Sequence, residues 1–233
     1  PAFADRVAEA WRVALVEEPL SRLFIEDSYS NRKGKGTHAA IAKAQKLMQK
    51  PGHSWCMQLD VRSFFNSIHR PTLLRNWLGF LSGLPLEPER LELAAYIYTA
   101  LLEQTPLKNH RTVQSSRRLL RNLPPHRVLS GSPPDTGLPI GSVASQHFAT
   151  FYLNSLDHYI KHTLRVKGYA RYMDDLLLFG PETATLLGWR DAIAAYLKSK
   201  LRLSLHPDKE LIGKPGRGVE YLGYRIYPHY LHV

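Results

Sequence analysis

The chain has 233 residues, 44% of them hydrophobic, and a formal net charge of +11. This length allows one sizeable core or two small lobes. No run approaches the ~18 to 20 apolar residues that span a bilayer, and no signal-peptide pattern opens the chain, so no membrane partner is expected. The single cysteine, Cys56, excludes an internal disulfide and suits a small buried residue in the reducing cytoplasm.

The excess of positive charge predicts a polyanionic partner, because it is clustered along the chain. The stretch from Gln104 to Pro134 contains no Asp or Glu. Its basic residues are Lys108, Arg111, Arg117, Arg118, Arg121 and Arg127. A second cluster, Arg32, Lys33 and Lys35, lies among glycines. We expect both clusters to bind nucleic-acid phosphates, with a solvated face as the alternative for the first.

Up to residue 103, the spacing of apolar residues predicts several helices and one strand. Apolar residues between Val7 and Leu15 have helical spacing. Thr37 is predicted to cap a second helix, which buries Ile41, Ala44 and Leu47. Residues 54–59 read as a buried strand that Asp60 ends, followed by a helical stretch and a further helix over 87–103.

The second half of the chain predicts one long helix, a hairpin, another helix and two strands. A proline-rich, basic insertion covers about 104–136. Ser142 begins a helix whose apolar stripe is Ala149, Tyr152, Leu153, Leu156 and Ile160. A hairpin around Tyr172, a helix over about 182–200 and strands near Leu203 and Tyr221 follow. This order predicts an α+β fold with an antiparallel sheet backed by helices.

Two adjacent carboxylates, Asp174 and Asp175, lie between apolar, strand-like segments. Like charges at the tip of a hairpin that is pushed towards a core need a cation, and oxygen ligands suit Mg²⁺. A solvated Asp-Asp turn is the alternative. A two-metal site needs a third carboxylate, and Asp60, at the end of the predicted strand, is the candidate.

These carboxylates and four further segments resemble the reverse transcriptases, in family order. The segments that carry the resemblance, besides Asp60 and Tyr172-Met173-Asp174-Asp175, are 31–38 (NRKGKGTH), 137–146 (GLPIGSVASQ), 205–209 (LHPDK) and 221–224 (YLGY). Together they cover roughly residues 5 to 228. The resemblance implies an RNA-directed DNA polymerase that uses a template RNA, a DNA or RNA primer and deoxynucleoside triphosphates.

The resemblance also implies a right-hand polymerase architecture. Residues 1–52 correspond to partial helical fingers and residues 53–233 to the palm, with a primer-grip-like hairpin over about 219–228. The basic hairpin of the fingers and the helical thumb of relatives are expected to be absent from residues 1–233.

By resemblance, Asp60, Asp174 and Asp175 hold two Mg²⁺ ions, with Mn²⁺ as a substitute and the Val61 carbonyl as a further ligand. Lys209 matches a lysine that protonates pyrophosphate, with an ordinary surface lysine as the alternative. Phe65 matches the steric gate against ribose. The nucleotide pocket is completed by Ile140, Gly141 and Gln146. Primer contacts are assigned to Tyr172, Met173, Leu222, Gly223 and Tyr224.

Ile140 stands where many relatives carry glutamine, and isoleucine offers a nucleotide only shape, which predicts lower fidelity. Ile140-Gly141 followed by Ser145-Gln146 is typical of diversity-generating retroelements, which use an accessory variability protein. The alternatives are another bacterial branch (phage defence, retron or group II intron-like) and a non-catalytic RNA-binding palm scaffold. His158 and His162, four residues apart, are predicted not to form a metal site, because no third ligand is placed nearby.

Overall fold

The computed structural model of the chain describes residues 3–103, 133, 135–138 and 143–232. The greater part of the predicted insertion over 104–136, as well as Ile140, Gly141 and Ser142, therefore lies outside the described residues. The chain forms two compact units, each built from two segments. The helical unit comprises Pro1–Pro19 and Ser63–Phe148, and the sheet unit comprises Leu20–Arg62 and Ala149–Val233.

Helices make up the helical unit: α1 (Phe3–Leu23), α3 (Phe64–Ser67), α4 (Arg70–Ser82), α5 (Pro88–Glu103) and α7 (Val143–Tyr152), of which α1 and α7 continue into the sheet unit. Its centre is aromatic. The Trp77 ring meets Tyr98 and Phe148 edge-to-face, with centroids 5.1 and 4.6 Å away. Such pairs add to the free energy gained from burial alone. The predicted helix over 87–103 is confirmed by α5.

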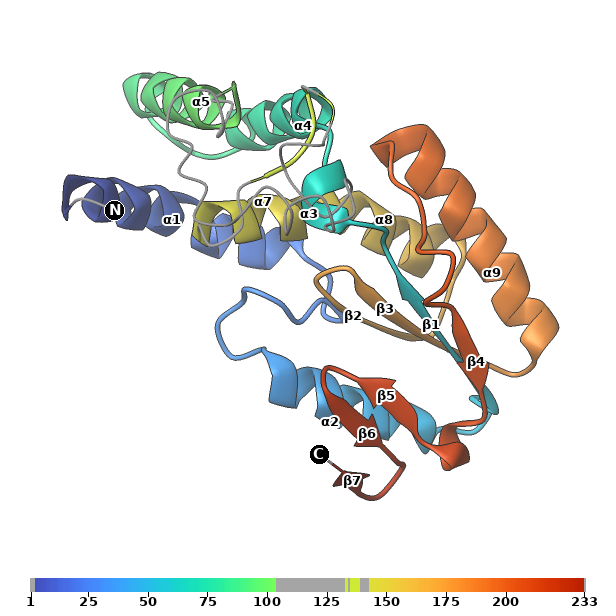
Figure 1. Cartoon of the computed structure of the whole chain (residues 1–233). Helices are drawn as coiled ribbons and strands as arrows, with labels where there is room; N and C mark the ends of the chain where they lie inside the picture. Colours follow the sequence, from blue (N-terminus) through green and yellow to red (C-terminus); the bar gives the residue numbers. More distant parts are fainter. Residues whose placement is uncertain (1–2, 104–132, 134, 139–142, 233) are drawn as a thin grey trace, which may run out of the picture. The chain divides into compact units, whose positions relative to one another are not determined.

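The sheet unit holds two antiparallel sheets (Figure 1). Strands β1 (Trp55–Asp60), β2 (Gly168–Tyr172), β3 (Asp175–Gly180) and β4 (Leu211–Gly213) form the first, in the order β2-β3-β1-β4. Strands β5 (Val219–Tyr221), β6 (Tyr224–Ile226) and β7 (Leu231–His232) form the second, in that order. The helical segments are α2 (Thr37–Met48), α8 (Asn154–His158), the π-helix Tyr159–Thr163, α9 (Thr183–Tyr196), the π-helix Leu197–Leu201 and the 3₁₀ turn Pro215–Arg217.

Strand β1 is buried on both faces, which explains why apolar residues stand on both of its faces, with Gln58 the exception before Asp60. Successive side chains alternate, so Met57 and Leu59 face one side and Cys56, Gln58 and Asp60 the other. Helices α2 and α9 pack against this sheet and lie on opposite sides of it in Figure 1. The predicted α+β fold, an antiparallel sheet backed by helices, is confirmed.

Two predictions about local structure are wrong. Thr37 is the first helical residue of α2, and Gly36 (φ 112°) is the cap residue, without a side-chain capping bond. The Thr37 hydroxyl instead donates to the Tyr172 hydroxyl at 3.4 Å. No strand forms near Leu203: the preceding Arg202 is left-handed (φ 54°), and Leu205 makes only an isolated bridge with Val61.

The fourth strand of the sheet begins only at Leu211, after Pro207, which cannot donate a ladder hydrogen bond. The predicted long helix is present from Val143, but it is divided at Leu153 into α7 and α8. Its buried stripe is confirmed, since Leu153, Leu156 and Ile160 are all buried. None of the described helices is both long and apolar enough to cross a membrane.

We expect Gly168→Ala to lower the free energy of unfolding by about 2 kcal/mol or more, because overpacking a core costs about 1–3 kcal/mol. A Cβ at Gly168 would lie 2.7 Å from the Phe179 Cβ and 2.8 Å from its carbonyl oxygen. The Phe179 backbone belongs to β3, the strand paired with β2, so it cannot move aside as the end of a flexible side chain can. Urea unfolding measures the change.

Gly188→Ala is the matched control, because a Cβ at this α9 position has nothing within 4 Å. It should stabilise the protein by about 0.5–1 kcal/mol through helix propensity. Equal unfolding midpoints for Gly168→Ala and the parent protein would contradict the expected clash.

Candidate active site

A tight turn presents the paired carboxylates. Strands β2 and β3 pair from Tyr172↔Asp175 outwards, so Met173 and Asp174 form the turn between them. Met173 has a left-handed backbone, with φ 53°. Non-glycine residues avoid this region, and such strain persists only where the surrounding structure enforces it. The turn is therefore held by its surroundings rather than by its own preference.

Strand β1 brings the third carboxylate to the same end of the sheet. Asp60 is the direct cross-strand partner of Asp175. The Asp60 carbonyl accepts a hydrogen bond from the His206 amide at 2.8 Å, and the next residue, Val61, bridges to Leu205. The loop that carries Lys209 is thereby fixed beside the strand end. Asp60, Asp174 and Asp175 thus lie together although two of them are more than 100 residues from the first.

Burial makes this group of negative charges costly. Burial, together with the charges of Asp60 and Asp175, raises the pKa of Asp174 to about 7. The pKa of Asp175 rises to about 6, first through burial and then through Asp60. Both shifts mean that the fold disfavours the ionised carboxylates unless a cation joins them.

Lys209 supplies one positive charge at the site. Its Nζ donates to Asp60 Oδ2 at 2.7 Å, and this hydrogen bond raises the pKa of Lys209. The lysine side chain is 60% exposed, whereas that of Asp60 is 10% exposed. Lys209 is therefore a charge partner of Asp60 in this structure, which the sequence pattern alone did not show.

The residues fit Mg²⁺ in donor chemistry, because carboxylate and carbonyl oxygens are its usual protein ligands. Their backbones place them at adjacent strand ends, and the raised pKa values of Asp174 and Asp175 show an unmet need for positive charge. Among the residues that the structure describes, no three Asp, Glu, His or Cys side chains yet converge on one point as metal ligands. To hold Mg²⁺, the three carboxylates would have to turn towards one another and Asp60 would have to release Lys209.

The hairpin predicted over about 219–228 is formed by β5 and β6. Its two turn residues, Leu222 (φ 54°) and Gly223 (φ 85°), are both left-handed, as in the turns that suit the twist of a hairpin. Val219, Tyr221 and Ile226 anchor it in a core shared with α2 and with β1–β3.

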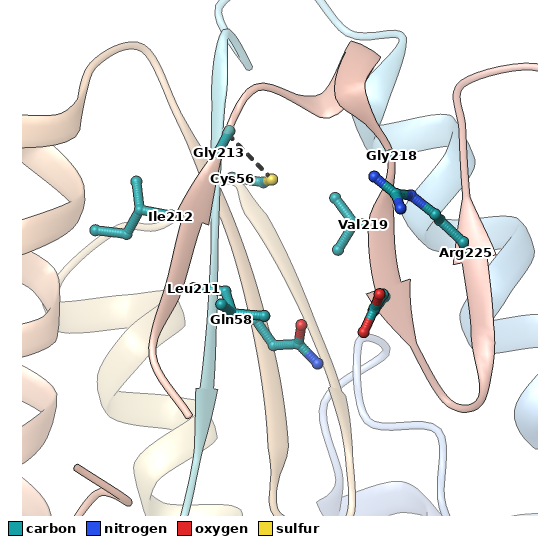
Figure 2. Close-up of a pocket in the computed structure, with 9 residues that line it drawn as sticks. Cys56, Gln58, Leu211, Ile212, Gly213, Gly218, Val219 and Arg225 are labelled. Carbon is teal, nitrogen blue, oxygen red and sulfur yellow. Dashed lines mark hydrogen bonds between the residues drawn. The ribbon is translucent and has the colours of Figure 1, made fainter. Parts of the chain in front are cut away.

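A cavity of about 230 Å³ remains under this hairpin (Figure 2). Cys56 and Gln58 of β1 line one side, and Val219 and Arg225 line the other. The Cys56 thiol donates to the Gly213 carbonyl at 3.2 Å, and burial raises its pKa to about 11. Cys56 is therefore a packed thiol rather than a nucleophile, as its predicted burial indicates.

Nucleotide-pocket candidates in the helical unit are Phe65 and Gln146. The Phe65 carbonyl accepts from the Leu138 amide at 2.9 Å, and its half-buried ring lies edge-on to Phe64 at 5.7 Å. Phe64 is buried in the core. Gln146 is partly buried on α7. Two further nucleotide-pocket candidates, Ile140 and Gly141, lie outside the described residues. So do five candidates for binding nucleic acid: Lys108, Arg111, Arg117, Arg118 and Arg121.

Two members of the second basic cluster, Arg32 and Lys35, are engaged within the protein. Arg32 donates to the carbonyls of Ser21, Ile25 and Ser28 at 2.7–3.1 Å. Lys35 pairs with the Glu26 carboxylate. Lys33 is exposed. The cluster therefore shapes its own loop through Arg32 and Lys35, and phosphate binding by its three members stays a prediction.

Sequence reasoning missed Arg171 and Asp157. The residues around Arg171 predict an apolar strand, yet the charged side chains of Arg171 and Asp157 are fully buried and paired at 2.6 Å. One sequence signal could have found this pair: Asp157 and Arg171 carry opposite charges, and each stands where the spacing of apolar residues predicts a buried side chain. The rings of His158 and His162 stack with centroids 5.4 Å apart, and His158 Nε2 hydrogen-bonds the Leu23 carbonyl.

Known proteins resemble this chain in sequence pattern and in fold. The model of a family described as reverse transcriptase (RNA-dependent DNA polymerase) matches residues 3–226. Comparison with curated proteins gives no match. Similar solved structures include telomerase from Candida albicans in complex with a TWJ fragment of telomeric RNA, with a TM-score of 0.59 and 12% identity. The similarity covers 94% of this chain and 36% of that one, and at this identity it shows the fold alone.

Proposed function

Because this chain belongs to the reverse transcriptase (RNA-dependent DNA polymerase) family, we propose that it carries the catalytic centre of an RNA-directed DNA polymerase. The observation that supports this most is the meeting of Asp60, Asp174 and Asp175 at one end of the sheet. A non-catalytic scaffold has no need to bury clustered charges, so this geometry disfavours the scaffold alternative. In the proposal, residues 1–52 act as partial fingers and 53–233 as palm.

The proposed reaction is nucleotidyl transfer with two metal ions. Asp60 and Asp174 would hold both ions, with Asp175 and the Val61 carbonyl completing the ligands. When bound, Mg²⁺ (or Mn²⁺) neutralises the triphosphate and lowers the pKa of the primer 3′-hydroxyl. The protein's own part is positioning, because phosphoryl transfer needs little covalent chemistry from side chains.

Lys209 and the two hairpins have distinct parts in this proposal. Lys209, an ammonium near neutral pH, would be released when Asp60 turns to the metal and would donate a proton to the leaving pyrophosphate. Tyr172, Met173 and the hairpin residues Leu222, Gly223 and Tyr224 would hold the primer end. The basic residues of 104–134 would bind the template RNA through its phosphates.

Primer extension on an RNA template tests the proposal, and Phe65→Ala tests sugar selection. The protein should extend a primer with deoxynucleotides, and Phe65→Ala should raise the incorporation of ribonucleotides at least about 10-fold, because removing bulk beside C2′ admits a hydroxyl. Phe64→Leu, a change in the buried neighbour, should leave the selection unchanged. If Phe65→Ala and the parent select sugars equally, the gate has been assigned to the wrong residue.

Within the family, we place the chain with the error-prone enzymes of diversity-generating retroelements. Ile140-Gly141 and Ser145-Gln146 support this placement, as does the Gly-Lys-Gly-Thr-His run. An accessory variability protein would be its partner. A template and variable repeat pair beside the gene would support the placement, whereas its absence together with low misincorporation opposite every template base would favour another branch.

A further inference from the structure

A buried arginine, Arg171, connects the turn formed by Met173 and Asp174 to helix α8. Arg171 lies on β2, two residues before Met173, and its side chain is completely inaccessible to solvent. It donates two parallel hydrogen bonds to the carboxylate of Asp157 on α8, from Nε to Oδ1 at 2.7 Å and from Nη2 to Oδ2 at 2.6 Å. The Tyr169 hydroxyl also donates to Asp157, at 2.7 Å. Burial would lower the pKa of Arg171, but Asp157 more than offsets this effect and the pKa is raised.

The remaining guanidinium nitrogen reaches the turn itself. Arg171 Nη1 donates to the Met173 carbonyl at 2.7 Å. Nη2 additionally contacts Ser28 Oγ at 3.2 Å and the Thr150 carbonyl at 3.3 Å. The planar fork of arginine can serve Asp157 and Met173 at once, whereas the single ammonium of lysine cannot reproduce both sets of bonds.

Met173 is held at each of its polar atoms. Its amide donates to Ser30 Oγ at 3.2 Å, and its carbonyl accepts from Arg171. Its sulfur accepts from Asn31 Nδ2 at 3.4 Å and from Thr150 Oγ1 at 3.5 Å. These contacts explain how a methionine stays in the left-handed conformation (φ 53°), which costs an L-residue about 1–2 kcal/mol. Without them, the turn would relax towards an unstrained backbone.

We propose that Arg171 is a positioning residue of the reaction, which fixes the Met173 carbonyl against Asp157 and so sets where Asp174 and Asp175 point. Ser30 and Asn31 complete this clamp from the segment before α2. The inference rests on the proposed polymerase function and names a part of its machinery that touches neither nucleotide nor metal. A misplacement of about 1 Å at such a site can cost about 100-fold in rate.

A double variant separates positioning from stability. Removing Arg171 alone leaves the buried Asp157 carboxylate without a positive charge beside it, which can unfold the protein. Replacing both, as Arg171→Met with Asp157→Leu, exchanges the ion pair for apolar packing, which is often tolerated. We expect this variant to fold, to bind RNA and nucleotide within about 3-fold of the parent, and to lose about 100-fold in kcat. Ser30→Ala, which leaves the ion pair intact, should lower kcat in the same direction by a smaller factor.

Arg190→Met is the matched control, because Arg190 pairs with Asp191 and Glu210 at the surface and should leave kcat unchanged. A folded double variant with the parent's kcat would overturn the proposal and leave the pair a purely structural role. Amide hydrogen exchange at Met173 gives a readout independent of catalysis: it should become at least about 10-fold faster in the double variant, and unchanged exchange would also overturn the clamp. The two proposals can fail separately. If the parent protein does not polymerise but amide exchange at Met173 is faster in the double variant, the proposed function is wrong and the clamp stands.

Discussion

Replacing Asp174 by asparagine is expected to abolish primer extension, with a loss of at least about 1,000-fold, since a bound metal contributes several kcal/mol to the transition state. The substitution keeps the size of the side chain and removes a charge that Mg²⁺ needs. Burial raises the pKa of Asp174 to about 7, so a neutral amide should not weaken the fold. RNA binding should remain largely intact, because the proposal assigns it to basic residues elsewhere.

Single-turnover extension with saturating primer and template measures this loss, and filter binding measures RNA affinity. Asp191→Asn is the control, because Asp191 is an exposed carboxylate that pairs only with Arg190 in the part of the chain described. It should change neither quantity. Extension by Asp174→Asn at a rate near that of the parent would remove the proposed metal role of this residue.

Magnesium is expected to raise the melting temperature far more at pH 8 than at pH 5.5. The pKa values of Asp174 and Asp175 in the fold, about 7 and about 6, lie above the ordinary value of 3.8. The fold therefore favours the protonated carboxyls: their contribution to stability is largest below pH 4 and is lost as the pH rises towards 7. For Asp174, three pKa units correspond to an upper limit of about 4 kcal/mol.

If metal binds the ionised carboxylates as proposed, it should recover this loss at high pH, while protons compete with it at low pH. Thermal unfolding with Mg²⁺ and with a chelator, at both pH values, measures the effect. In the chelator, Asp174→Asn should be more stable than the parent at pH 8 and less dependent on pH. An equal response to Mg²⁺ at both pH values would contradict the proposed coupling.

The sequence was sufficient for features that depend on neighbouring residues. Apolar flanks around Asp174 and Asp175 predicted a turn at the end of two strands, and the mainly apolar run 54–59 predicted β1 with Asp60 at its end. Periodicity of 3.6 residues predicted α5 and the buried side of α2. These signals are local, because the repeat of a helix or strand and the burial of one face leave a direct mark on residue spacing.

Contacts between distant segments were decided only by the tertiary structure. Lys209 meets Asp60 across 149 residues of chain, and no spacing rule indicates that pairing. Arg171 and Asp157 are each anomalous in a buried segment, but only the packing of β2 against α8 shows that one neutralises the other and that the spare nitrogen reaches Met173. Arg32 and Lys35 show the converse: their charge suggested phosphate binding, while the fold turns them onto carbonyls and Glu26. Residue type alone determines whether a side chain is charged. The partner that each charged side chain meets depends on which elements the fold brings within hydrogen-bond distance.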